Sequence, residues 1–218
     1  MKFVVIEGTD GSGKQTQTKL LKEYLVKNGK SVLSQSFPNY QSASSAPVKM
    51  YLGGEICKKA NELDAYQSSV LFSVDRLCTM ESLKHDKSDF WVFDRYIQSN
   101  LIHQGSKISK KRELKKYTNW LLSFEYETLK LPQPDLVIFL NMPPKNSIAL
   151  AQGRTEQKTG NKKDIHEQDS EHLHNAWKTG MFLAKKLGWK VIDCANPDGT
   201  LKSIQAVHAQ VVEVISYL

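Results

Sequence analysis

Short apolar runs alternate along the chain with longer segments in which apolar residues recur at helical spacing. The apolar runs, which predict buried strands, cover residues 3–6, 31–36, 90–93, 136–140 and 191–192. The intervening periodicity predicts helices over residues 15–27, 47–52, 66–84, 110–129, 146–154, 170–187 and 201–217. Because strands that alternate with helices build parallel sheets covered on both faces, we predict an α/β fold with a five-stranded parallel sheet.

The whole chain, residues 1–218, is predicted to form one domain. Folds of the α/β class with this length are commonly single units, and the sequence contains no internal repeat and no Pro/Ser-rich linker. One segment differs from the rest: residues 153–161 are polar, bounded by glycine and contain Arg154 and Lys158. Its low apolar content favours a mobile lid over about residues 153–166, with a tolerated surface loop as the alternative.

The composition predicts a soluble, cytoplasmic protein. No apolar stretch is long enough to span a membrane, and Met1 leads directly into the first predicted strand without room for a signal peptide. Three cysteines, an odd number without metal-ligand spacing, are typical of reduced thiols. The net charge of +7 suits anionic nucleotides, because the basic cluster at residues 107–116 lacks the interleaved aromatic residues of a nucleic-acid groove. We therefore expect neither nucleic acid nor a membrane as a partner.

A glycine-rich segment lies between the first predicted strand and the first predicted helix. It reads Gly8-Thr9-Asp10-Gly11-Ser12-Gly13-Lys14 and has the full spacing of a phosphate-binding loop. Glycines let such a backbone curl until successive N–H groups and the positive end of a helix point at one anion, while the lysine reaches the β- and γ-phosphates. We therefore predict a site for ATP or another nucleoside triphosphate made by Gly8, Thr9, Asp10, Gly11, Ser12, Gly13, Lys14, Gln15 and Thr16.

The loop departs from the usual pattern at its metal ligand. A hydroxyl residue normally follows the lysine, but here Gln15 stands at that position and Thr16 comes next. A second pair of charges, Asp94 and Arg95, directly follows the predicted strand at residues 90–93. Because open α/β sheets bind ligands where their strands end, we interpret Asp94 as a metal ligand, directly or through water, and Arg95 as a phosphate contact. An ordinary solvent-facing ion pair is the alternative.

Several motifs, in order along the chain, resemble those of thymidylate kinases. Besides Ile6-Glu7 and the phosphate-binding loop, they are Phe37-Pro38, Leu71-Phe72-Ser73-Val74-Asp75-Arg76, Asp94-Arg95-Tyr96 with Ser99-Asn100 and Gln104, and Pro134-Asp135-Leu136 with Pro143-Pro144. Agreement among separate motifs over most of the chain is more specific than the loop alone. The resemblance implies a P-loop kinase fold, ATP as donor, dTMP as acceptor, Mg²⁺ as cofactor and a homodimer.

The resemblance also implies which residues bind dTMP. In this interpretation Phe72 stacks on thymine, Arg76 hydrogen-bonds its carbonyl edge, Arg95 anchors the acceptor phosphate and Asp10 meets the deoxyribose 3′-hydroxyl. Packing in the core is the alternative for Phe72, because an aromatic residue beside Leu71 at helical spacing is usually buried. The complete predicted set is Asp10, Phe37, Phe72, Arg76, Arg95, Ser99, Asn100 and Gln104.

The catalytic residues implied by the resemblance are three cations. Lys14 serves the donor and Arg95 the acceptor, since phosphoryl transfer depends on positioning and charge neutralisation more than on a general base. Some members carry a further arginine in the phosphate-binding loop, where this chain has Gly11, and others carry it in the lid. Arg154 is therefore the candidate, and Lys158 a weaker one, because an ammonium cannot make a bidentate contact.

A few positions depart from the family pattern, and other functions stay open. Asn39 and Tyr40 stand where an arginine is common, and His103 stands where a tyrosine is common. The rival functions are another P-loop kinase, acting on a different nucleoside monophosphate or on a deoxynucleoside, and a non-catalytic ATP-binding module. A histidine-rich set lacks the spacing of a zinc site and is interpreted as an exposed helical surface, with metal binding as the alternative: His166, Glu167, His172 and His174. An apolar set could contribute to a dimer interface or equally to the core: Val70, Leu71, Val74 and Leu77.

Overall fold

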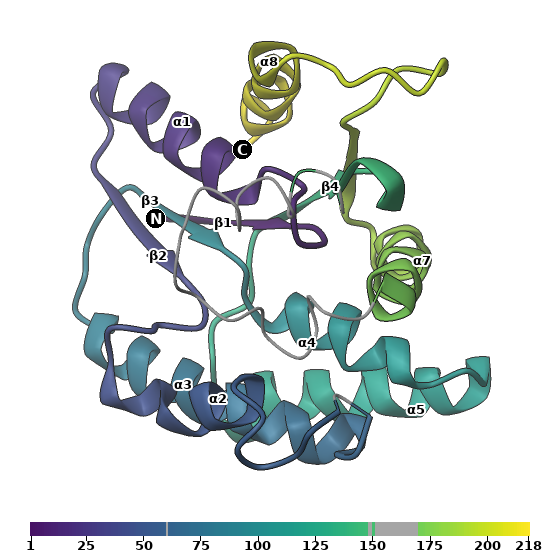
Figure 1. Cartoon of the computed structure of the whole chain (residues 1–218). Coiled ribbons are helices and arrows are strands. Elements are labelled where there is room, and N and C mark those ends of the chain that lie inside the picture. Colours follow the sequence, from purple (N-terminus) through teal and green to yellow (C-terminus); the bar gives the residue numbers. More distant parts are fainter. Residues whose placement is uncertain (60, 148–149, 151–169) are drawn as a thin grey trace.

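A fully parallel five-stranded sheet runs through the molecule, which confirms the predicted fold class (Figure 1). The computed structural model describes residues 1–59, 61–147, 150 and 170–218. The strands are β1 (Lys2–Glu7), β2 (Val32–Ser36), β3 (Phe90–Asp94), β4 (Leu136–Asn141) and β5 (Lys190–Asp193), in the spatial order β2-β3-β1-β4-β5. Strand order reverses at β1, because β3 lies on one side of it and β4 on the other. Ligands of open α/β sheets bind at the carboxyl end of such a reversal.

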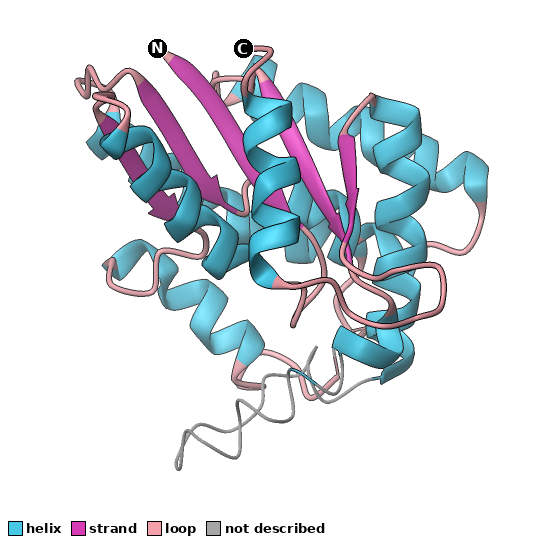
Figure 2. Ribbon diagram, turned by 90° about the horizontal axis from the view of Figure 1, so that it is seen from above, coloured by secondary structure: helices cyan, strands magenta, loops and turns pink. Residues whose placement is uncertain are grey.

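Helices cover both faces of the sheet (Figures 1 and 2). On one face lie α1 (Lys14–Lys27) and α8 (Ile204–Ile215). The opposite side carries α2 (Ala46–Leu52), α3 (Ala65–Leu83), α4 (Ile97–His103), α5 (Lys111–Leu122) and α7 (Ser170–Leu187). Shorter turns are 3₁₀-helical at Ala43–Ser45 and Gly105–Lys107, and the segment Ser123–Thr128, which continues α5, is π-helical.

The side chains of β1 point alternately to the two faces of the sheet, and a hydrophobic core lies on each face. Phe3 and Val5 point to one face and join residues of α4 and α5, whereas Val4 and Ile6 point to the other and join residues of α1 and α8. All four side chains are buried, as expected for a central strand with helices on both sides. The phosphate-binding loop follows directly after β1. Because β1 is packed on both faces and paired on both sides, the start of the loop is held in a fixed position.

One helix was not predicted from the sequence. The segment Ile97–His103 forms α4, but nearly all of its side chains are buried, so it lacks the polar face that produces amphipathic periodicity. The helix predicted over residues 146–154 falls largely outside the described residues. Within the described part of the chain, no helix combines the length and apolar character required to cross a membrane.

Candidate active site

The glycine-rich segment forms a tight loop between β1 and α1. Gly8, Gly11 and Gly13 all have positive φ angles, of 154°, 78° and 89°, which side chains other than glycine rarely adopt. A Cβ atom at Gly11 would also collide with the backbone of Ser147. Because α1 begins at Lys14, directly after Gly13, the first free N–H groups of the helix face the hollow of the loop. The residues predicted to bind the triphosphate are therefore brought together around one helix N-terminus.

Lys14 is buried beneath this loop. Its Nζ donates to the Thr9 carbonyl oxygen at 2.9 Å, so the ammonium lies against the loop that it is predicted to serve. Burial, with help from the nearby charge of Arg95, lowers the pKa of Lys14 to about 8, although Asp10, Asp94 and Glu7 act in the opposite direction. The bound anion would reverse this shift, because a negative charge close to an ammonium favours its protonated form.

A cavity of about 260 Å³ opens beside the loop at the carboxyl edge of the sheet. It contains every residue predicted for the acceptor site and several that were not. Its lining consists of Asp10, Ser36, Phe37, Pro38, Tyr40, Leu52, Phe72, Asp75, Arg76, Arg95, Tyr96, Ser99, Asn100, His103 and Gln104. Residues from four separate sequence motifs thus share one cavity. Phe72 is only partly buried and contacts Tyr51 edge-on at 6.1 Å, so its ring belongs both to the cavity wall and to a small apolar cluster.

Arg95 lies between the phosphate-binding loop and α4. It directly follows β3 with a φ of 69°, which is uncommon for a residue with a side chain. Its Nη2 pairs with Asp10 of the loop, and its Nη1 donates to Ser99 Oγ at 3.2 Å and to His103 Nε2 at 2.9 Å. Because a guanidinium can only donate, His103 Nε2 accepts in this contact. The alternative of a solvent-facing Asp94–Arg95 pair is wrong, since Arg95 pairs with Asp10 instead.

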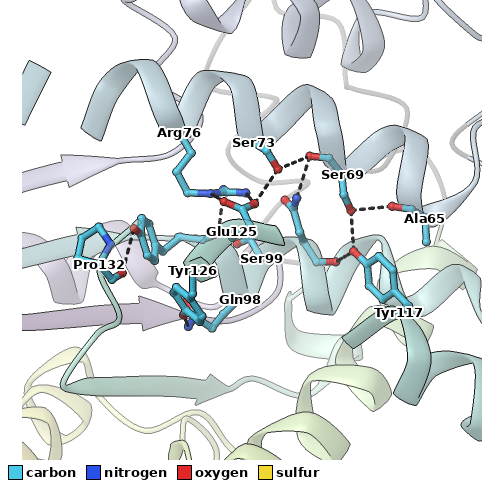
Figure 3. A network of polar contacts seen from close by, with 12 residues as sticks. Ala65, Ser69, Ser73, Arg76, Gln98, Ser99, Tyr117, Glu125, Tyr126 and Pro132 are labelled. Carbon is cyan, nitrogen blue, oxygen red and sulfur yellow. Dashed lines mark hydrogen bonds and ion pairs between the residues drawn. The ribbon is translucent and has the colours of Figure 1, made fainter. Parts of the chain in front are cut away.

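The Arg76 side chain is fixed by a buried ion pair that the sequence did not predict (Figure 3). Its Nε donates to Glu125 Oε2 at 3.0 Å, its Nη2 pairs with Glu125 Oε1, and its Nη1 donates to the Tyr96 carbonyl oxygen at 3.2 Å. Ser73 Oγ also donates to Glu125 Oε1, at 2.7 Å. Burial alone would lower the pKa of Arg76, but the Glu125 carboxylate outweighs burial and raises it. These contacts use three of the five guanidinium N–H groups, and Arg76 also lines the cavity.

Two amides next to Arg76 are oriented by residues of α3. Asn100 Nδ2 donates to the Ser69 carbonyl oxygen at 3.1 Å, and the residue lines the cavity. Gln104 Oε1 accepts from Ser68 Oγ at 2.8 Å, which leaves its amide nitrogen. The cavity is therefore lined by one guanidinium, which can only donate, and by two amides, which can donate or accept.

Asp94 is a buried carboxylate with one oxygen that makes no hydrogen bond to the described residues. It is 9% exposed, and its Oδ1 is buried without a hydrogen-bond partner among the described residues. Asp94 also lines a second cavity, of about 330 Å³, together with Gln15 and Thr18. Thr16 does not line it. Among the described residues no cluster of three or more His, Cys, Asp or Glu side chains suits a metal, so any metal there relies on few protein ligands.

Other predictions were wrong or fall outside the described part of the chain. His172 is buried, and its ring stacks on that of His103 at 5.8 Å, whereas His174 is exposed as expected. Arg154, the lid at residues 153–166, His166 and Glu167 lie outside the described residues. The buried carboxylates of Glu7 and Glu125 were not predicted as site residues. Glu7 occurs in one of the motifs, but no local pattern shows which groups it contacts, and nothing in the sequence around Glu125 indicates its burial.

Comparisons with known proteins agree on one family. The model of the family described as "Thymidylate kinase" matches residues 6–209. The chain is 29% identical over 194 residues to the thymidylate kinase of Plasmodium falciparum, covering 85% of this chain and 84% of that protein. It is 27% identical over 222 residues to that of Schizosaccharomyces pombe, covering 99% and 91%. A solved structure of thymidylate kinase from Candida albicans shares the fold, with a TM-score of 0.70, 20% identity, and coverage of 99% and 91%.

Proposed function

The chain belongs to the thymidylate kinase family of phosphotransferases, and we propose that it transfers the γ-phosphoryl group of ATP to the 5′-phosphate of dTMP, giving dTDP and ADP. The observation that carries this proposal is the contact between Asp10 and Arg95. Asp10 belongs to the phosphate-binding loop and lines the acceptor cavity. Arg95, which follows β3, lines the same cavity and pairs with Asp10. Donor and acceptor phosphates would therefore meet at one point, where Lys14 and Arg95 supply positive charge.

The polar groups of the cavity support a thymine acceptor. The exposed edge of thymine offers an acceptor at O4, a donor at N3 and an acceptor at O2. We assign Arg76 and Gln104 as donors and Asn100 as acceptor toward these three groups, roles that their side chains can fill. Cytosine carries a donor in place of O4 and an acceptor in place of the N3 donor, so it would leave buried groups of this set unpaired, which is costly. The partly exposed Phe72 ring supplies an apolar surface on which the base can stack.

We propose that Mg²⁺ accompanies ATP and that Asp94 holds it, directly or through water. The unpartnered Oδ1 fits a cation, and magnesium keeps several water ligands, so a site with few protein ligands suits it. When bound, the ion would neutralise phosphate oxygens. Gln15 shares the cavity of Asp94 and is the better placed of the two loop candidates, whereas Thr16 lies outside it.

Asp94→Asn is expected to raise the Mg²⁺ concentration needed for half-maximal turnover by about tenfold, because an amide binds a hard cation less strongly than a carboxylate. The measurement is the initial rate across an Mg²⁺ titration at fixed ATP. Glu23→Gln, which changes an exposed carboxylate on α1, serves as control and should leave the titration unchanged. An unaltered Mg²⁺ requirement in Asp94→Asn would remove this residue from the metal site.

ATP affinity is expected to fall by roughly eightfold between pH 7.5 and pH 9. The pKa of Lys14 in the free protein lies at about 8, lowered by burial and by Arg95, so its ammonium is lost as the pH rises through that value. A bound triphosphate favours the protonated form, and binding above pH 8 must therefore take up a proton. Calorimetric titration with ATP at several pH values measures this linkage. Lys14→Met should bind ATP weakly with no such dependence, and a parallel decline in Lys14→Met would contradict the assignment.

We propose Arg154 as the arginine that stabilises charge during transfer. Arg154→Ala is expected to lower kcat by about 10³-fold, the effect typical of such arginines, with little change in the Kd for dTMP. Lys158→Ala should have a smaller effect, because an ammonium lacks the bidentate geometry. Steady-state rates and equilibrium binding of dTMP separate the two quantities. A kcat within threefold of the wild-type value would exclude Arg154 from the mechanism.

We propose a homodimer formed through one face of α3. Val70, Val74 and Leu77 are 40%, 42% and 36% exposed and follow helical spacing, so they form one apolar stripe. Leu71, in contrast, packs against the cluster that contains Val48 and Tyr51. Self-association would bury the stripe. Light scattering of the purified protein tests this, and a mass of one chain at micromolar concentration would reject it.

The decisive experiment is ADP formation with ATP and Mg²⁺ against dTMP, dUMP, dCMP, dGMP, AMP and thymidine. Preference for dTMP supports the proposal. Turnover of a different acceptor would retain a P-loop kinase with another specificity. Absence of turnover with every acceptor, despite binding of ATP, would favour a non-catalytic ATP-binding module.

A further inference from the structure

Glu7 is a fully buried carboxylate under the acceptor site, at the end of β1. Its oxygens accept from three donors. The backbone N–H of Tyr96 lies 2.9 Å from Oε1, Ser99 Oγ lies 3.0 and 2.9 Å from the two oxygens, and the N–H of Gly8 lies 3.4 Å from Oε2. The carboxylate therefore joins the start of the phosphate-binding loop to the turn that follows β3.

The Ser99 hydroxyl connects Glu7 to Arg95. A serine has a single O–H, and both nearby oxygens of Glu7 are acceptors, so the hydrogen points at Glu7. The lone pairs of Ser99 Oγ are then left for Arg95 Nη1 at 3.2 Å, which can only donate. Without the carboxylate, the Ser99 hydrogen could turn toward the guanidinium, and this contact would become repulsive. Glu7 thus sets the direction of a hydrogen bond that it does not itself make.

The backbone contact of Glu7 acts on the same arginine. Arg95 has a φ of 69°, a conformation that persists only where its surroundings impose it. Glu7 accepts from the N–H of the following residue, Tyr96, while the Arg95 N–H donates to the Ile6 carbonyl oxygen at 3.1 Å. Two adjacent residues of β1 therefore fix the two peptide groups that flank Arg95.

We propose that Glu7 is a positioning residue which, through Ser99 and the Tyr96 N–H, orients the Arg95 guanidinium toward the 5′-phosphate of the acceptor. The identity of that acceptor rests on the proposed function. At the end of the cavity proposed to bind the base, Arg76 is oriented by a different carboxylate, because it pairs directly with Glu125. Loss of Glu7 should therefore affect recognition of the phosphate and spare recognition of the base.

Binding of dTMP and thymidine to the same variants separates these two ends, because the ligands differ only in the phosphate. Glu7→Gln keeps the volume of the side chain but replaces one acceptor oxygen with an NH₂ donor, and Ser99→Ala removes the connecting hydroxyl. Both variants are expected to bind dTMP about ten- to a hundredfold more weakly, the scale of a lost hydrogen bond to a charged group, while thymidine binds as in wild type. Phe72→Ala is the matched control and should weaken both ligands by the same factor.

Calorimetric titration gives the ratio of the two dissociation constants, and thermal unfolding reports whether each variant is folded. An unchanged preference for dTMP in Ser99→Ala or in folded Glu7→Gln would overturn the inference. Equal weakening of both ligands would overturn it as well, because that result indicates a purely structural role. Should Glu7→Gln fail to fold, Ser99→Ala decides the question alone. Wild-type protein with no preference for dTMP over thymidine would instead overturn the proposed acceptor, and the inference with it.

Discussion

Lys14→Met is expected to lower kcat by about 10³-fold and to leave the Kd for dTMP within twofold of wild type. Methionine has a similar length but no charge, so the variant removes the cation from the donor site without opening a large void. Lys14 does not line the acceptor cavity, which is why acceptor binding should be spared. Stability should not fall either, since Lys14 is a buried ammonium whose pKa burial lowers to about 8, and its desolvation cost disappears with the charge.

The matched control for this prediction is Lys27→Met, at the C-terminal end of the same helix. Lys27 is exposed and lines neither cavity, so its loss should change neither rate nor stability appreciably. Initial rates, dTMP titrations and thermal unfolding of both variants complete the comparison. A Lys14→Met protein that is folded and retains more than a tenth of wild-type turnover would show that the loop lysine is not a principal source of transition-state charge.

Local chemistry made the donor site predictable from the sequence. A glycine-rich loop with this spacing between a strand and a helix indicates a phosphate-binding loop. The structure places Gly8 to Lys14 between β1 and α1 in this way. The sheet was predictable chiefly from its three central strands, β1, β3 and β4, which are short apolar runs buried on both faces. The α4 helix was not, because burial of Gln98, Asn100 and His103 beside its apolar residues removes the polar face on which helix prediction depends.

The supports of the acceptor site depend on tertiary contacts that no local pattern contains. Arg76 and Glu125 are 49 residues apart, and Glu125 lies in the segment predicted to be helical over residues 110–129, where no local pattern indicates its burial. The segment is π-helical instead, and Glu125 is fully buried in it. An extra residue in a helical turn changes which side chain faces inward, and such turns are frequent at functional sites. Sequence motifs therefore indicated the groups that line the acceptor cavity, but not the carboxylates behind them.

Glu125→Leu is expected to reduce the free energy of unfolding by about 3–5 kcal/mol, because it leaves the Arg76 guanidinium buried without its counterion. Urea unfolding measures this change. Thr118→Ala, at a buried hydroxyl on α5 that donates to the Leu114 carbonyl oxygen, is a control for loss of a buried polar group on the same helix. It should cost about 1 kcal/mol. A loss in Glu125→Leu no larger than that of Thr118→Ala would mean that the ion pair is not what holds Arg76.

The double variant Arg76→Met/Glu125→Leu distinguishes stability from recognition. Replacing both members of a buried ion pair with apolar residues of similar volume is often neutral, so its free energy of unfolding should return to within about 1 kcal/mol of wild type. Ser73 Oγ keeps an acceptor in the Ser69 carbonyl oxygen at 3.0 Å, which limits the remaining cost. Binding of dTMP should stay weak, because the donors facing the base are gone. Recovery of both stability and affinity would show that Arg76 has no role in binding thymine, and the preference for this base would then have to come from Asn100 and Gln104.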